Sequence, residues 1–468
     1  LNGCYDQYFQ IRSKLLQPVT SSLVEETNAN DGGKSLVNFI QDGKSSYQQL
    51  CIDEYNIFMK FFPREQSHQK INSWLCRLCE PLYDCVRTRI LREADISMLC
   101  DSVTLFRQYY EFEETSEEYT KQFHDIKFDK IFEPIVQKLQ ARLILRVQIY
   151  IQENIVKHIP TKDSFIISRR KRRTEQQITE GDEPYDTEEI SRNTNMWTGD
   201  MDSYYPTLRK ALWLLSKIYE MVNSVVFDDL AHHIVHDCIL SLRKAYDMVQ
   251  TSSSGINNLD VKLAYLKNLL MLRQEIQNFN IQYTVNETYL DFSGVETFFK
   301  SVRDKSGARK ASDSSSVFSV ARSLVPRVVN SMVDARTELM VELRNIIKDF
   351  TDCVAKDIID DTLEIDEGSK SNLLVNNLKL RTNIEEKLPH IHSEICNFID
   401  DSEIVMHLVE AIQETVIQAY NDFYEEVSEM AENGALNKRD VSELMYNDVF
   451  ADFMNKTTSK LTNPTALQ

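Results

Sequence analysis

Two of the nine cysteines form a Cys-x-x-Cys motif, Cys76-Arg77-Leu78-Cys79. A zinc site would need a second Cys pair or a His pair at a suitable spacing. Cys85 and Cys100 follow, but their spacings fit neither a zinc ribbon nor a zinc finger. A redox motif would need a βαβ context, whereas this segment has a helical pattern. We therefore interpret these side chains as small, buried thiols.

Histidines cluster at His232, His233 and His236, and Asp237 follows. His232 and His236 are one helical turn apart and could share a metal ion, which would suit a helical metalloenzyme. The general-base Glu of a helical zinc protease is missing, because residue 233 is His. Apolar neighbours predict an amphipathic helix with the histidines on its polar edge: Ile234, Val235, Ile239 and Leu240.

The remaining motifs are short. The run Arg169–Arg173 resembles a nuclear localisation signal or an anionic-lipid patch, and its alternative interpretation is a solvated charge run in a loop. His390 and His392 are a weaker metal candidate, and Asn286 and Asn455 open N-glycosylation acceptors that mean little without a secretory route. No phosphate loop or nucleophile elbow is present. The sequence therefore predicts no enzyme and no catalytic, cofactor-binding or metal-binding residues.

Composition narrows the class of protein. The chain has 53 basic and 72 acidic residues, a net charge of −19, which argues against general nucleic-acid binding. Only 11 Gly and 10 Pro occur in 468 residues, far below the usual shares of about 7% and about 5%, which predicts long helices. No secretory signal opens the chain and no apolar run reaches about 18 residues, so we expect a cytosolic protein with reduced thiols. The first residue is Leu1 rather than Met, so we expect a fragment or missing leading residues.

Helical periodicity recurs along most of the chain. Two adjacent apolar stripes, one of them ending at Val225, predict a single helix over 207–227, and a further stripe runs from Val405 to Val427. Because one core stops growing at roughly 250–300 residues, several packing units are expected. We predict an N-terminal bundle over 1–160, a mobile charged loop over 161–203, a middle bundle over 204–302, a polar linker over 303–316 and a C-terminal bundle over 317–468.

Several blocks of the sequence are similar to those of a known family. The most specific are Tyr205–Lys210 and Leu215–Tyr219, and the others are Asp53–Phe58 with Phe61 and Phe62, Leu78–Asp84 with Arg87, Arg142–Gln152, and Leu263–Leu270. Over roughly residues 5–291 the chain thereby resembles the family of the third subunit of the conserved oligomeric Golgi (COG) tethering complex. The long 161–203 segment departs from the family, and the N-terminal heptad segment of the family is missing.

The resemblance implies an all-α protein, an elongated rod of stacked helical bundles without an active site. It implies a peripheral protein on the cytosolic face of the Golgi apparatus, which tethers vesicles in intra-Golgi retrograde transport upstream of SNARE-mediated fusion. The implied partners are the other COG subunits, especially the lobe of subunits one to four. SNAREs and small GTPases are further candidates, the Golgi membrane is reached indirectly, and no nucleic acid is expected. The alternative is a helical scaffold or adaptor of another assembly, acting in the nucleus with Arg169–Arg173 as its import signal.

Overall fold

The computed structural model describes the helical parts of the chain. The described residues are 2–29, 35–62, 65–107, 109, 125–161, 165, 204–251, 257–279, 289–291, 327–329, 335–363, 373–433, 441 and 443–462. They fall into two compact units that interleave along the sequence. The first lies within Leu1–Glu153, Leu214–Ala231 and Val285–Met332, and the second within Asn154–Trp213, His232–Thr284 and Val333–Gln468.

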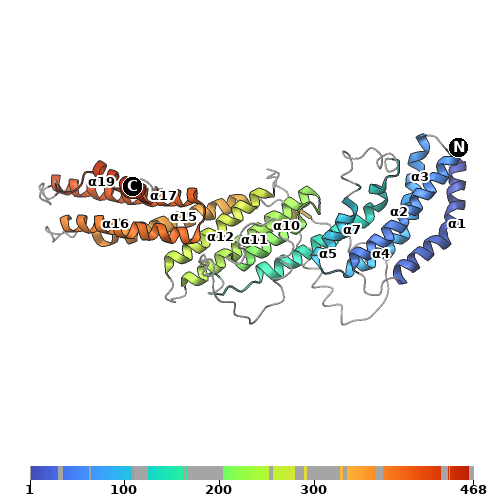
Figure 1. Cartoon of the computed structure of the whole chain (residues 1–468), viewed down its shortest axis with the longest axis horizontal. Helices are drawn as coiled ribbons and strands as arrows, with labels where there is room; N and C mark the ends of the chain where they lie inside the picture. The colour runs from blue at the N-terminus through green and yellow to red at the C-terminus, as the bar shows by residue number, and fades with distance from the viewer. Residues whose placement is uncertain are drawn as a thin grey trace. The chain divides into compact units, whose positions relative to one another are not determined.

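The first unit is built on helices that pack against one another (Figure 1), and its core is rich in aromatic side chains. Its helices are α1 (Asn2–Ala29), α2 (Leu36–Phe61), α3 (Glu65–Leu78), α4 (Glu80–Arg92), α5 (Ile96–Arg107) and α7 (Phe128–Ile151), and a π-helical turn, Gln152–Val156, follows α7. Local chemistry sets the ends. Ser35 caps α2 by accepting the Asn38 amide at 3.3 Å, and Pro81 occupies the first turn of α4, where its missing amide costs nothing.

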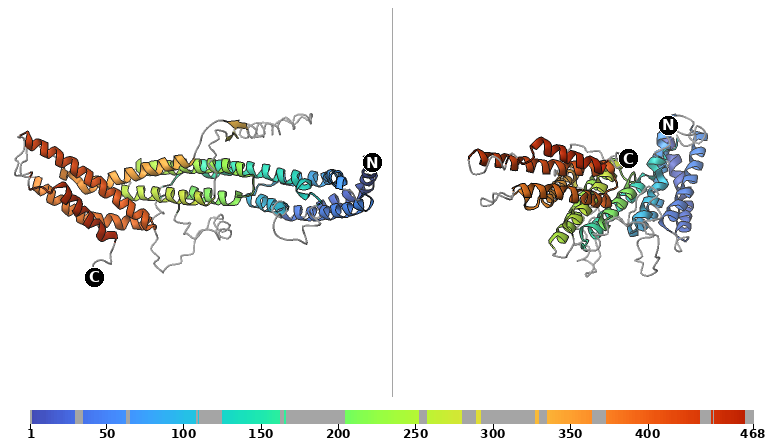
Figure 2. Two further views of the ribbon diagram at one scale, coloured as in Figure 1. Left: turned by 90° about the horizontal axis from the view of Figure 1, so that it is seen from above. Right: turned by 60° about the vertical axis from the view of Figure 1, so that its left-hand side comes forward.

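The second unit contains the C-terminal helices. It holds α12 (Asn258–Asn278), α15 (Ala335–Ile359), a short 3₁₀ turn (Asp360–Leu363), α16 (Leu373–Phe398), α17 (Ser402–Glu432) and α19 (Asn447–Thr462). Helices α16 and α17 pack against α15, and α19 packs against α17 and α16 (orange to red in Figure 2). Asp401 caps α17 by accepting the Glu403 and Ile404 amides. The stripe predicted from Val405 to Val427 is buried along α17, as the 3.6-residue period requires.

The helix predicted over 207–227 is instead two helices, α10 (Pro206–Ile218) and α11 (Ser224–Thr251). Glu220 adopts φ 60°, a left-handed conformation that ends an α-helix. Asn223 then accepts the Val225 amide at 3.0 Å and starts α11, which leaves the Val225 side chain 70% exposed. The prediction was wrong because the apolar stripes continue across a break that only local backbone chemistry marks.

The all-α class is confirmed. The one sheet among the described residues is an antiparallel pair of three-residue strands, β1 (Tyr289–Asp291) and β2 (Arg327–Val329), with Leu290 opposite Val328. The stacking of bundles into a rod stays a prediction. The predicted linker 303–316, almost all of the predicted loop 161–203, the run Arg169–Arg173 and Asn286 lie outside the described residues.

Candidate interaction surfaces

The Cys-x-x-Cys motif lies where α3 meets α4, and Cys51 of α2 lies near both of its thiols. Cys79 is buried, and its sulfur lies 3.5 Å from that of Cys51 on α2. The hydrogen bond with Cys51 and burial raise the pKa of Cys79, so the thiol stays protonated. Cys100 on α5 donates to the Lys217 carbonyl at 3.2 Å, and burial raises its pKa to about 12. Cys79 and Cys100 are buried, as interpreted from the sequence, whereas Cys76 and Cys85 are only half-buried.

The predicted histidine cluster lies on α11. The Nδ1 atom of His236 is 2.6 Å from the Glu338 carboxylate on α15, so this ring has a carboxylate partner from another helix. Burial raises the pKa of the neighbouring Asp237. The structure therefore uses His236 to join α11 to α15.

The later candidates do not converge either. His390 is exposed on α16, while His392 faces Cys396, one turn along the same helix, at 3.8 Å. Asn455 on α19 accepts a hydrogen bond from Gln413 at 2.6 Å. Across the part of the chain that the structure describes, no three His, Cys, Asp or Glu side chains gather as metal ligands. None of the described helices is long and apolar enough to span a bilayer.

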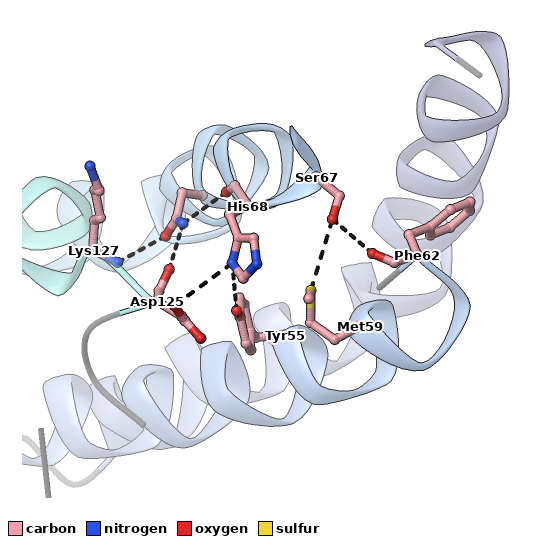
Figure 3. A network of polar contacts seen from close by, with 8 residues as sticks. Tyr55, Met59, Phe62, Ser67, His68, Asp125 and Lys127 are labelled. Carbon is pink, nitrogen blue, oxygen red and sulfur yellow. Dashed lines mark hydrogen bonds and ion pairs between the residues drawn. The ribbon is translucent and has the colours of Figure 1, made fainter. Parts of the chain in front are cut away.

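A Tyr–His–Asp line between α2, α3 and the start of α7 has the residue types of a catalytic relay (Figure 3). Tyr55 Oη lies 2.8 Å from His68 Nδ1, and Asp125 Oδ1 lies 4.0 Å from the same nitrogen. A relay needs the two different ring nitrogens for its two partners. Burial and the charge of Asp125 also raise the pKa of Tyr55, so its hydroxyl stays protonated. We therefore interpret Tyr55, His68 and Asp125 as contacts that hold these helices together.

Asn72 completes this contact. Its side chain donates to the Asp125 carbonyl at 2.8 Å and accepts the Lys127 amide at 2.9 Å. Both bonds fix the backbone that enters α7 against α3. The cluster in Figure 3 therefore sets how α7 packs in the first unit.

Helix α1 is fixed on the first unit by aromatic rings. Phe9 stacks at 5.3 Å on Phe58 of α2 and at 5.2 Å on Trp74 of α3, and the Trp74 indole donates to Ser13 at 2.9 Å. The rings bury large apolar areas and resist rotation of the helix. One face of α1 is thereby committed to the core.

Another face of the same helix is apolar and exposed. Ile11, Leu15 and Val19 follow one another at four-residue steps, and their exposed fractions are 59%, 59% and 43%. Residues at this spacing form one stripe on a helix. We call these three residues the α1 stripe. Contiguous exposed apolar groups on a fixed helix are typical of a protein contact.

In the second unit, α15 pairs its acidic face with α11 and α12. The paired residues, in order along α15, are His236 with Glu338, Arg243 and Tyr265 with Glu342, and Tyr246 and Lys262 with Asp349. These polar contacts satisfy groups that helix packing would otherwise desolvate at a cost. The three helices are therefore joined in one register.

Sequence reasoning missed the α1 stripe. The signal was available, because α1 carries apolar residues on two faces, Tyr5, Phe9 and Leu16 on one and the α1 stripe on the other. A helix with two apolar faces has two contacts to make. Periodicity alone does not say which face the core takes.

The fold and its surfaces indicate a class of protein, an all-helical protein that acts through contact surfaces. Comparison with known proteins identifies the family within this class. The sequence matches the family Conserved oligomeric Golgi complex subunit 3, C-terminal, over residues 1–295. The chain belongs to this family, and the match does not favour the alternative of a nuclear adaptor.

Individual relatives agree. Conserved oligomeric Golgi complex subunit 3 of Saccharomyces cerevisiae is 54% identical over 497 residues, which cover 98% of this chain and 62% of the relative. The subunit of the same name from Schizosaccharomyces pombe is 27% identical over 440 residues, which cover 91% of this chain and 54% of the relative. The human subunit of the same name is 24% identical over 320 residues, which cover 62% of this chain and 38% of the relative. The chain thus spans less than two thirds of the length of these curated relatives.

Proposed function

We propose that this chain is a structural, non-enzymatic subunit of the conserved oligomeric Golgi tethering complex. The observation that carries the proposal is the α1 stripe, bare on a helix whose other face is fixed, in a chain of this family. A helix from another subunit covers the stripe, in the manner of helices that pair through residues at three- and four-residue steps.

The cellular role follows from membership of the complex. The subunit acts at the cytosolic face of the Golgi apparatus as a peripheral protein, in intra-Golgi retrograde transport before SNARE-mediated fusion. Its partners are the other subunits, especially those of the lobe of subunits one to four, and SNAREs and small GTPases are contacted by the assembled complex. The relatives' shared name and the helical fold support this role.

Affinity purification of the tagged chain from cells tests the proposal. Subunits one, two and four should co-purify with the wild-type chain. Ile11→Glu combined with Leu15→Glu should reduce their recovery at least tenfold, because burying a Leu or Ile side chain contributes about 1.5–3 kcal/mol and a buried carboxylate is costly. Circular dichroism should be unchanged, since both side chains already face solvent.

The matched control places the same two charges on another exposed face of α1, as Gln10→Glu with Gln17→Glu. This variant should retain the partners. Failure of the wild-type chain to recover any of these subunits would overturn membership. Full recovery with the stripe variant would overturn only the role of the stripe.

A further inference from the structure

An open groove lies in the second unit between α12, α15 and α17. Its volume is about 530 Å³. Apolar side chains line it, namely Leu270 of α12 with Met340, Leu343 and Ile347 of α15. Leu343 is buried, whereas Met340 is 41% exposed, so the lining reaches from the core to the surface. A groove of this kind accepts apolar side chains from outside.

The rim of the groove is basic. Arg273 of α12 and Arg344 and Lys348 of α15 all line it and are exposed, and Asp352 is the one carboxylate among its lining residues. Within the described parts of the chain, no ion pair engages these three cations. A cluster of three cations against one carboxylate stands out in a chain whose net charge is −19.

The carboxylates on another face of α15 have the charged partners that these three cations lack. There each carboxylate has a partner, as in the pairs of Glu342 with Arg243 and Asp349 with Lys262. Arg344 and Lys348 lie on a different side of the helix, four residues apart. Side chains at this spacing stand one above the other, so they can meet two carboxylates one turn apart on a second helix.

We propose that this groove binds an acidic amphipathic helix of a partner protein. The partner's apolar residues enter between Met340, Leu343 and Leu270, and its carboxylates, one turn apart, pair with Arg344 and Lys348. The basic rim selects an acidic occupant by charge complementarity. The partner need not belong to the Golgi complex, so the inference goes beyond the proposed function and does not involve the α1 stripe.

The neighbouring helix argues against a membrane as the occupant. Helix α17 contributes Thr415 to the groove. It contains no Lys or Arg, but it carries the carboxylates of Glu403, Glu410, Glu414, Asp422, Glu425, Glu426, Glu429 and Glu432. A flat anionic bilayer would have to approach these charges together with the rim and would be repelled. A single helix can turn its own carboxylates toward α12 and α15 alone.

Site-specific photo-crosslinking in cells tests the proposal. The full chain carries p-benzoylphenylalanine in place of Met340, and mass spectrometry identifies the crosslinked peptide. We expect a segment of another protein with apolar residues at three- and four-residue steps and a net negative charge. Arg344→Glu with Lys348→Glu should lower the yield of this adduct about tenfold or more, because two attractions become repulsions.

The matched control is Lys456→Glu with Lys460→Glu, two exposed lysines four residues apart on α19. It should leave the yield unchanged, and circular dichroism should show both variants folded. A synthetic peptide of the captured segment should bind the wild-type chain, and its Glu→Lys form should prefer the Arg344→Glu, Lys348→Glu variant. An adduct with lipid, with a basic segment or with this chain itself, no adduct, or a yield that ignores the charge reversal would overturn the proposal.

Discussion

Glu342 of α15 is the side chain whose removal should most weaken the contact between α12 and α15. It accepts the hydroxyl of Tyr265 at 2.8 Å and pairs with Arg243 of α11. The Tyr265 ring is only 2% exposed, so its hydroxyl has no access to water once the acceptor is gone. Arg243 is 39% exposed and can be solvated instead. The two partners of Glu342 should therefore respond differently to its loss.

Three variants separate these contributions to the free energy of unfolding. Glu342→Leu leaves a buried hydroxyl without its acceptor and should cost about 2–4 kcal/mol, the sum of a lost hydrogen bond and a desolvated donor. Glu342→Gln keeps an oxygen for Tyr265 and loses only the half-exposed ion pair, at a cost below about 1 kcal/mol. Tyr265→Phe removes the hydroxyl itself, so no buried donor is left without an acceptor, and it should cost about 1 kcal/mol.

The double variant Glu342→Leu, Tyr265→Phe closes a mutant cycle. Because Phe has no hydroxyl to satisfy, its cost should fall below the sum of the single costs by about 1–2 kcal/mol. Urea unfolding followed by circular dichroism measures the free energies, and hydrogen exchange of α12 and α15 reports the local effect if the two units unfold separately. Equal costs for Glu342→Leu and Glu342→Gln, or strict additivity in the cycle, would refute the reasoning.

Three further predictions follow from buried titratable groups. Lys44 is buried against the Leu105 carbonyl, and burial lowers its pKa to about 8. Lys44→Met should therefore raise the free energy of unfolding at pH 7 by about 1 kcal/mol. This gain should shrink between pH 8 and about 10.4 in thermal unfolding scans, because the lysine then loses its proton in the folded state first. The whole chain should lose stability above about pH 8.5, because burial raises the pKa of several thiols and tyrosines. Above that pH the unfolded state releases protons that the folded state keeps. Midpoints of urea unfolding that rise with pH in this range would contradict the prediction. Elemental analysis should find no stoichiometric zinc, and zinc lost on changing Cys76 and Cys79 to Ser would overturn our interpretation of that motif.

Much of the fold could be predicted because helix formation depends on residues that are close together in the sequence. The stripe from Val405 to Val427 is buried along α17, and Asp401, directly before it, is the cap that a helix start requires. The break at Glu220 was not predicted. Its backbone turns left-handed beneath an apolar pattern that continues unchanged, and a pattern of side chains does not record one residue's φ.

The candidate surfaces were less predictable. The sequence indicated packed thiols at Cys76 and Cys79 but not which side chain they meet, and the sulfur beside Cys79 is that of Cys51, which lies 28 residues away in the sequence. Similarly, His236 meets Glu338 across 102 residues rather than His232 across four. Residues one turn apart share a face, but a side chain's partner comes from whichever helix packs there.

The sequence by itself determined the helical class and the family, because residue periodicity and family motifs are both local. Only the tertiary structure decided which apolar face of α1 is covered and which cations of α15 have a partner. Those outcomes depend on how segments far apart in the sequence pack against each other. Burial is a property of that packing, so an exposed Ile11 and a buried Phe9 look alike until the helices are placed.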